Sequence, residues 1–257
     1  MTEPLPIDRD AGAHYLARLI GLLNAVAETQ SQMIESVSEL MSRTIRSNGL
    51  VHFFGSGHSM LPALEIFPRY GSFVGLHPLV DPRLLWFSVL GSGGIPEMLF
   101  LQDTEGYAKV FLAGQHVCEG DMMVIFSHGG TSRVVIDTAL YAREKGLPVV
   151  AIMSQRTGEA AEPRHSSGKK LIDLSDYLLD TGVPSGEGLV NVTGLPEPVG
   201  AGSTVVATAI GLALVSSCAA RLAASGYPVV QSVRAAASEH AAYANVYEAY
   251  EQALNLP

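Results

Sequence analysis

Apolar side chains recur at two different spacings along the chain, and the change between them falls near residue 50. Before it, apolar residues stand three and four positions apart, as at Leu16, Ile20 and Leu23. This spacing is typical of amphipathic helices. Residues 1–48 are therefore predicted to form an N-terminal helical arm, whose apolar stripe must be covered by the domain body or by a second subunit.

After residue 49, short apolar runs alternate with helical patterns. The runs have the length of β-strands and lie at residues 50–54, 72–76, 122–126, 149–153 and 177–179. The helical patterns cover residues 59–69, 132–145, 203–225 and 233–254, and the Gly- and Pro-rich residues 181–202 are expected to form an irregular loop. Buried strands with helices between them predict a parallel sheet covered on both faces. Because such crossovers are right-handed, we expect an α/β domain over residues 49–257, with a doubly wound, flavodoxin-like sheet of five strands.

The composition limits the partners of such a domain. Charged residues make up 16% of the 257 residues, against about 25% in an average globular protein, so we expect that much surface is hidden, either in a thick three-layer fold or in an oligomer. As a partner we expect a second copy of the chain, in a homodimer or higher homo-oligomer. The net charge of −9 argues against nucleic acid, which needs clustered Lys and Arg. Two cysteines, Cys118 and Cys218, do not make a disulfide framework, and no secretory signal is apparent, so a cytoplasmic location is expected.

One segment has the length of a membrane span. No charged residue occurs between Glu197 and Arg221. However, Pro198, glycines and five hydroxyl residues dilute its hydropathy. We therefore expect a buried core helix and no contact with a membrane.

Two loops carry the candidate chemistry, because each joins a predicted strand to a predicted helix. The first is Gly55, Ser56, Gly57, His58 and Ser59, and the second is Ser127, His128, Gly129, Gly130, Thr131 and Ser132. Glycines allow the backbone to approach a ligand closely, and a helix N-terminus offers free N–H groups to an anion. Open α/β sheets bind ligands at the carboxyl ends of their strands. The two loops together predict one shared phosphate site.

Cofactor and metal sites are not predicted. A dinucleotide-binding fingerprint would need a third glycine where Met60 stands, and no acidic residue near Leu76 is placed to hold a ribose. Neither H-x-x-x-H nor C-x-x-C occurs, so we expect neither a bound metal nor a cofactor.

The pair of loops resembles the SIS (sugar isomerase) domain of phosphosugar isomerases, whose motifs run approximately G-x-G-x-S and S-x-S-G-x-[ST]. Most of the chain is similar to a bacterial group of SIS-domain proteins that are distantly similar to N-acetylmuramic acid 6-phosphate etherases. The stretches that carry this likeness are residues 51–70, 104–107, 164–170 and 200–204. The resemblance implies that Ser59, Ser127 and Ser132 contact a phosphate. Gly129 departs from the motif, because a serine is usual there; His128 is one candidate to replace its hydroxyl, and a different anion is the other explanation.

Isomerisation of a sugar phosphate needs a base to move a proton between C1 and C2, and an acid to open the ring. Four residues are candidates for these roles: Glu65, Glu105, His165 and His240. Each has a simpler alternative. Glu65 has the spacing to pair with Arg69 at the helix surface, Glu105 to cap a helix start, and His165 to stand in a solvated loop. His240 matches a histidine that the resemblance places within reach of a neighbouring subunit's pocket, although a lone helical histidine is more often structural.

The function that these observations predict is binding of a small-molecule phosphosugar. The activity we expect is that of a phosphosugar isomerase of the aldose–ketose type, which transfers a proton through an enediol. Two alternatives stay open at this point: a phosphosugar lyase or etherase on the same scaffold, and a non-catalytic sensor of sugar phosphates.

Overall fold

The fold is built on a five-stranded parallel sheet. The computed structural model describes residues 9–67, 69–86, 88–91, 93–232 and 239–254. The strands are β1 (Val51–Phe54), β2 (Leu76–Leu79), β3 (Met122–Phe126), β4 (Val149–Met153) and β5 (Tyr177–Asp180). Their order is β2-β1-β3-β4-β5, and each neighbouring pair is parallel. The predicted flavodoxin-like α/β sheet is confirmed.

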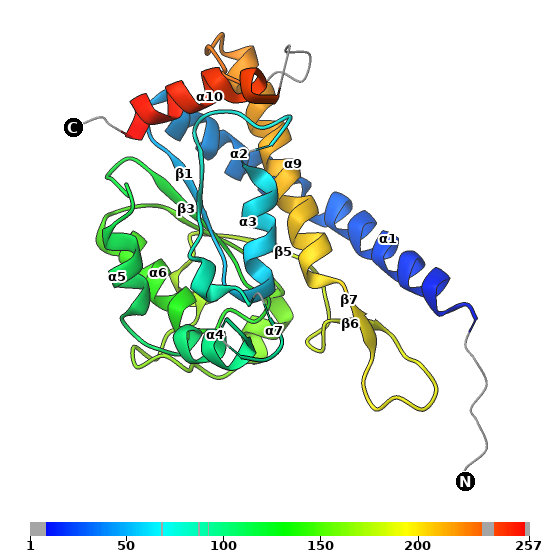
Figure 1. Ribbon diagram of the computed structural model, residues 1–257. Helices are drawn as coiled ribbons and strands as arrows, with labels where there is room; N and C mark the ends of the chain where they lie inside the picture. The colour runs from blue at the N-terminus through cyan, green and yellow to red at the C-terminus, as the bar shows by residue number, and fades with distance from the viewer. Residues whose placement is uncertain (1–8, 68, 87, 92, 233–238, 255–257) are drawn as a thin grey trace.

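Helices cover both faces of the sheet, because successive side chains of its strands point to opposite sides. In β1, Phe53 belongs to one hydrophobic core and Phe54 to the other. The first core is closed by α2 (Ser31–Arg46), α3 (Met60–Ile66) and α9 (Ser203–Ala224). The second is closed by α5 (Tyr107–Ala113), α6 (Arg133–Glu144) and α8 (Leu171–Leu174), as Figure 1 shows for α5 and α6 on one side and α3 and α9 on the other.

Further elements lie around this body. They are the helices α1 (Ala11–Thr29), α4 (Ile95–Gln102), α7 (Gln155–Ala160) and α10 (Glu239–Leu254), the 3-10 turns η1 (Gly57–Ser59) and η2 (Pro82–Leu84), and the antiparallel pair β6 (Gly188–Val190) and β7 (Val199–Ala201). The short pair β6–β7 lies within the segment predicted to be an irregular loop, so that prediction was wrong for these residues.

The two N-terminal helices bury very different amounts of surface. Eight residues of α2 are buried, whereas α1 buries only Val26 among its residues. Leu16 and Ile20 of α1 remain 58% and 57% exposed, and α1 projects away from the sheet in Figure 1. Tyr15 ties this helix to the hairpin by donating a hydrogen bond to the carbonyl of Ala201. Of the two N-terminal helices, therefore, only α2 has its apolar stripe covered within one chain. The domain boundary predicted at residue 48 stays a prediction.

The second strand begins four residues later than the sequence indicated, at Leu76–Leu79 instead of 72–76. The residues before it pair elsewhere: Phe73 bridges Gln231, and Val74 donates its N–H to the carbonyl of Val230. Pro78 is tolerated because β2 is an edge strand, where a missing N–H costs no ladder bond.

Helix α9 is, within the described part of the chain, the one helix whose length and composition would allow it to cross a membrane. In the fold it packs along α2 and α3, and its buried positions include Ile210, Leu214 and Cys218. It therefore occupies the place of a core helix, as the sequence predicted.

The strand order determines where a ligand can enter. From β1 the chain passes to β2 on one side, whereas β3, β4 and β5 follow on the other. The loops after β1 and β3 therefore diverge at the carboxyl edge of the sheet, which is where open α/β sheets form their ligand crevice.

Candidate functional site

A crevice opens at this switch point between the first and second loops. Its outer part has a volume of about 290 Å³, and it is lined by every residue from Ser56 to Ser59 and from Ser127 to Ser132. A smaller recess beneath it is lined by Ser59, Ser127 and His128 together with the start of α9. All but one of the residues predicted from the two loops thus line one crevice, and the exception, Gly55, is the buried residue that directly follows β1.

The first loop has this shape because of its glycines. An added Cβ at Gly55 would lie 1.9 Å from the backbone oxygen of Ser59, so no other residue fits this turn. Gly57 has φ +60°, a conformation that glycine adopts without strain. The turn buries Ser56, whose hydroxyl donates to Gln102 of α4 at 2.8 Å, and leaves Ser59 partly exposed in the crevice.

The second loop is held by its own serine. The Ser127 hydroxyl accepts a hydrogen bond from the N–H of Gly130 at 3.1 Å, and Gly130 has φ +67°. Ser132 is the N-cap of α6, but its hydroxyl makes no capping bond. Gly129, in contrast, has no positive φ, and an added Cβ would meet only the Thr157 methyl at 3.7 Å. The serine that the family motif carries at this position would therefore fit.

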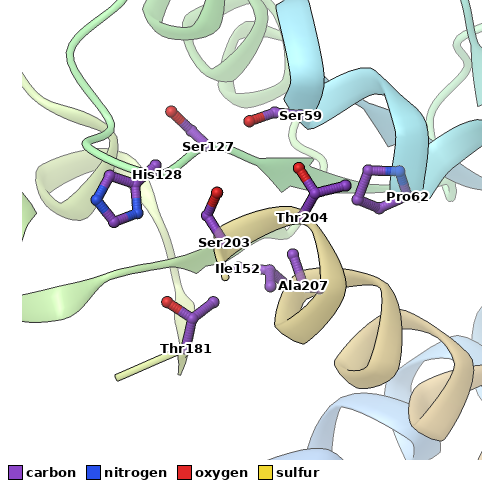
Figure 2. A pocket seen from close by; sticks show the side chains of 9 residues that line it. All are labelled: Ser59, Pro62, Ser127, His128, Ile152, Thr181, Ser203, Thr204 and Ala207. Atoms are coloured by element: carbon purple, nitrogen blue, oxygen red, sulfur yellow. The ribbon is translucent and has the colours of Figure 1, made fainter. Parts of the chain in front are cut away.

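The start of α9 forms a third wall, which the sequence analysis did not assign. Ser203 and Thr204 open this helix and face Ser59 and Ser127 across the recess (Figure 2). Beside Ser203, Glu187 also lines the outer crevice, and its carboxylate accepts a hydrogen bond from the Ser203 hydroxyl. The available signal was Gly202 followed by two hydroxyl residues at the start of a long uncharged helix.

The crevice is rich in unused hydrogen-bond donors. Within the described part of the chain, the hydroxyls of Ser59, Thr131, Ser132 and Thr204 make no hydrogen bond. The helices α6 and α9 both begin at the crevice, and neither has an acidic residue in its first turn. Free hydroxyls and the positive ends of two helix dipoles favour an anion.

The two loop histidines line the crevice in different ways. His58 is exposed at the rim, where its ring meets the edge of Trp86 at a centroid distance of 4.5 Å. His128 lies deeper: its Nε2 faces the carbonyl oxygen of Ser185 at 3.3 Å. Its Nδ1 is buried and has no hydrogen-bond partner among the described residues.

Glu65 lies outside this crevice in a single chain. It stands near the end of α3 and pairs with Arg69, and both side chains are more than 40% exposed. This is the ion pair that its spacing allows. A catalytic role for Glu65 stays a prediction, and it requires that a second copy of the chain bring this carboxylate to a crevice.

Glu105 and His165 meet each other, although 60 positions separate them in the sequence. Glu105 accepts a hydrogen bond from the N–H of Ser166 and pairs with Arg133 at 3.2 Å. His165 is nearly buried, with Nε2 3.2 Å from Asp137 and 3.9 Å from Glu105. The hydrogen bonds from Ser166, with smaller contributions from His165 and Arg133, hold the pKa of Glu105 below its ordinary value.

This cluster joins the two segments that share the family likeness near residues 104–107 and 164–170. Asp137 also accepts a hydrogen bond from the N–H of Gly106, and Arg164 pairs with Asp103 at 2.6 Å. None of these charged side chains lines the crevice described above. The arrangement braces the loop after β4 against the start of α6, and catalysis by Glu105 or His165 stays a prediction.

His240 is the second residue of α10, and its side chain lies outside what the structure describes. The helix itself crosses the end of the sheet away from α4 and α7, as Figure 1 shows. Tyr250 of α10 donates a hydrogen bond to the carbonyl of Leu76, the first residue of β2. The helix that carries His240 therefore lies at the amino end of the strands, far from its own crevice.

A buried histidine pair lies at that same amino end. His52 and His77 face each other with their Nδ1 atoms 3.0 Å apart, and His52 Nε2 lies 2.9 Å from Asp121. Burial, together with the charge on His52, lowers the pKa of His77 to about 4. Among the described residues no group of three or more His, Cys, Asp or Glu side chains has the arrangement of a metal site.

The fold defines an α/β protein with a hydroxyl-rich crevice at its topological switch point. Solved structures share the fold. A phosphoheptose isomerase from Francisella tularensis superposes with a TM-score of 0.56 at 14% identity, covering 83% of this chain and 98% of that one. The phosphoheptose isomerase GmhA from Neisseria gonorrhoeae gives a TM-score of 0.52 at 17% identity, covering 82% and 97%.

The family follows from the sequence comparisons. The SIS domain family matches residues 14–154, more than half of the chain. UPF0309 protein SCO4393 from Streptomyces coelicolor is 30% identical over 223 residues, which is 85% of this chain and 86% of that protein. UPF0309 protein OB3413 from Oceanobacillus iheyensis is 30% identical over 192 residues, or 75% and 76%. The chain belongs to the SIS domain family and is a homologue of its UPF0309 proteins, which confirms the predicted resemblance.

Proposed function

We propose that the crevice binds a sugar phosphate, with the phosphate held by the two loops. One observation carries this proposal: the hydroxyls of Ser59, Thr131 and Ser132 line the same crevice, at the starts of α3 and α6, without a partner in the described chain. A doubly negative phosphate can accept hydrogen bonds from all of them. The crevice volume of about 290 Å³ is at the lower edge of the range of about 300–1,000 Å³ that small-molecule sites occupy.

The reaction that we propose is aldose–ketose isomerisation. A base takes the proton from C2 and returns it to C1, while the proton on the C2 oxygen moves to the C1 oxygen through the enediol. The composition of the sugar does not change, so the reaction requires no oxidant or cofactor. Supporting this activity are the fold shared with two phosphoheptose isomerases and the family to which the chain belongs.

The base and acid are proposed to come in part from a second copy of the chain. Glu65 and the helix of His240 both lie away from the crevice of their own chain, so they can act only in a partner's crevice. The exposed Leu16 and Ile20 on α1, and the low content of charged residues, support such a homodimer. If no second copy supplies these groups, the chain is better described as a sugar-phosphate sensor, since the predicted Glu65, Glu105 and His165 of one chain lie off the crevice.

The test combines binding with proton exchange. Calorimetry with a panel of aldose and ketose phosphates should give binding that Ser59→Ala and Ser132→Ala each weaken about tenfold, since a hydrogen bond to a charged group is worth about 1.5–3 kcal/mol. Ser216→Ala, at an exposed position on α9, is the matched control and should bind like the wild type. Deuterium from solvent should enter C1 of the ketose and C2 of the aldose during turnover.

Three outcomes separate the alternatives. Binding with exchange at C2 supports the isomerase, and binding with release of a hydroxy acid, identified by mass, supports a lyase or etherase. Binding without turnover supports the sensor. If no sugar phosphate binds, or if the two serine variants bind as well as wild type, the proposed function is wrong.

A further inference from the structure

The crevice has two chemically different ends. At the start of α6 it presents hydroxyl donors, as described above. At the start of α9, beside the free Thr204 hydroxyl, it presents two hydrogen-bond acceptors, the carboxylate of Glu187 and the Nδ1 atom of His128. We propose that Glu187 and His128 bind the hydroxyl groups of the sugar and thereby fix the direction in which the ligand lies; this inference rests on the proposed function.

Glu187 is held in place by an unusual backbone conformation. It has φ +59°, one of two positive values among the described non-glycine residues. Its N–H donates to the carbonyl of Pro184 at 2.9 Å, and its own carbonyl accepts from the N–H of Gly202 at 3.0 Å. A side chain other than glycine is disfavoured in this region, so the conformation points to a use for the carboxylate.

The carboxylate of Glu187 places negative charge at the start of α9. It accepts the Ser203 hydroxyl through Oε2, Oε1 has no hydrogen-bond partner among the described residues, and Glu187 lines the crevice. In this position it offsets the positive end of the α9 dipole. A phosphate would be repelled here, whereas the start of α6 has no acid in its first turn, and Arg133 there is paired with Glu105. The phosphate therefore belongs at α6, and the rest of the ligand extends towards Glu187.

The tautomer of His128 follows from its neighbour. A carbonyl oxygen can only accept a hydrogen bond, so the contact between Nε2 and Ser185 places the hydrogen of the neutral ring on Nε2. Nδ1 then carries a lone pair, and it is buried without a partner in the described chain. A buried acceptor needs a donor, and a sugar hydroxyl supplies one. In this state His128 does not replace the hydroxyl donor that Gly129 lacks.

The experiment compares two kinds of phosphate ester. Methyl phosphate carries the phosphate without sugar-like hydroxyl groups. Three polyol phosphates carry the phosphate and the hydroxyl groups but cannot isomerise: glucitol 6-phosphate, mannitol 6-phosphate and ribitol 5-phosphate. Calorimetry measures each with the wild type, with Glu187→Gln and with Glu197→Gln. Glu197 is the matched control because it is an exposed carboxylate between β6 and β7.

The inference predicts that Glu187→Gln weakens the tightest polyol phosphate about tenfold while methyl phosphate binds no less tightly than to wild type. Glu197→Gln should change neither. The retained binding of methyl phosphate shows that the variant is folded. If Glu187→Gln weakens both ligands equally, or neither, or if no polyol phosphate binds wild type more tightly than methyl phosphate, the inference is wrong and the proposed phosphate site still stands. If the wild type binds none of the four, the proposed function itself fails.

Discussion

The departure of the second loop from the family motif allows a gain-of-affinity experiment. The substitution Gly129→Ser restores the hydroxyl that SIS proteins usually carry at this position. The structure can accept it, because Gly129 has no positive φ and an added Cβ would make an ordinary contact of 3.7 Å with the Thr157 methyl. The new side chain would stand between His128 and Gly130, in the loop that lines the crevice.

The expected gain can be estimated from the hydrogen bond that is added. A hydrogen bond to a charged group contributes about 1.5–3 kcal/mol, and ordering the serine side chain offsets part of this. A net gain of about 1.4 kcal/mol corresponds to a tenfold increase in affinity. Calorimetric titration with methyl phosphate measures it without interference from turnover.

The neighbouring glycine supplies a matched control. Gly130 has φ +67°, and an added Cβ would lie 2.7 Å from Met153 Cε and 3.1 Å from Leu171 Cβ. Gly130→Ser should therefore lose about 1–3 kcal/mol of unfolding free energy and bind methyl phosphate less well. A Gly129→Ser variant that melts at the wild-type temperature yet binds methyl phosphate no more tightly would refute the assignment of this loop to the phosphate.

Two further predictions concern the fold around the site. Gly55→Ala should lower the free energy of unfolding by about 3 kcal/mol or more, because its Cβ would overlap the backbone oxygen of Ser59. Gly12→Ala is the control and should not lower it, since nothing lies within 4 Å of an added Cβ there. Equal melting temperatures for Gly55→Ala and wild type would contradict this prediction. The pKa of His77 is lowered from 6.5 to about 4 in the folded chain, so as the pH falls His77 is protonated in the unfolded chain before it is protonated in the folded one. The free energy of unfolding should therefore fall by about 3 kcal/mol as the pH drops from 6.5 to 4. Urea unfolding across this range measures how the free energy of unfolding changes with pH. This pH dependence should be weaker for His77→Asn but unchanged for the exposed His14→Asn. A pH dependence of His77→Asn equal to that of the wild type would contradict the burial argument.

The sequence predicted the parts of the fold that local pattern controls. The runs 122–126 and 149–153 are wholly apolar, and the structure places β3 and β4 on those same residues. The strand β2 was misplaced because His77 and Pro78 interrupt its apolar pattern. Its position depends on the pairing of Phe73 with the distant Gln231, which no local signal reveals.

The candidate site was predictable to the same extent. Both loops follow strongly patterned strands, so their common crevice follows from strand order alone. The end of the crevice that holds the carboxylate of Glu187 could not be predicted in this way. Glu187 lies in a segment without regular pattern, and its contact with Ser203 depends on the return of the chain from the hairpin to α9. The pairing of Glu105 with His165 likewise joins residues that only the tertiary fold brings together.

The central claim is that the two loops hold the phosphate of a sugar phosphate. A crystal of this chain grown with a polyol phosphate tests it most directly, since the phosphorus position can be read from the density. We predict the phosphate within hydrogen-bond distance of Ser59, Thr131 and Ser132 at the start of α6, with the polyol directed to Glu187. A phosphate bound at Ser203 and the start of α9, or anywhere outside the crevice, would contradict the account.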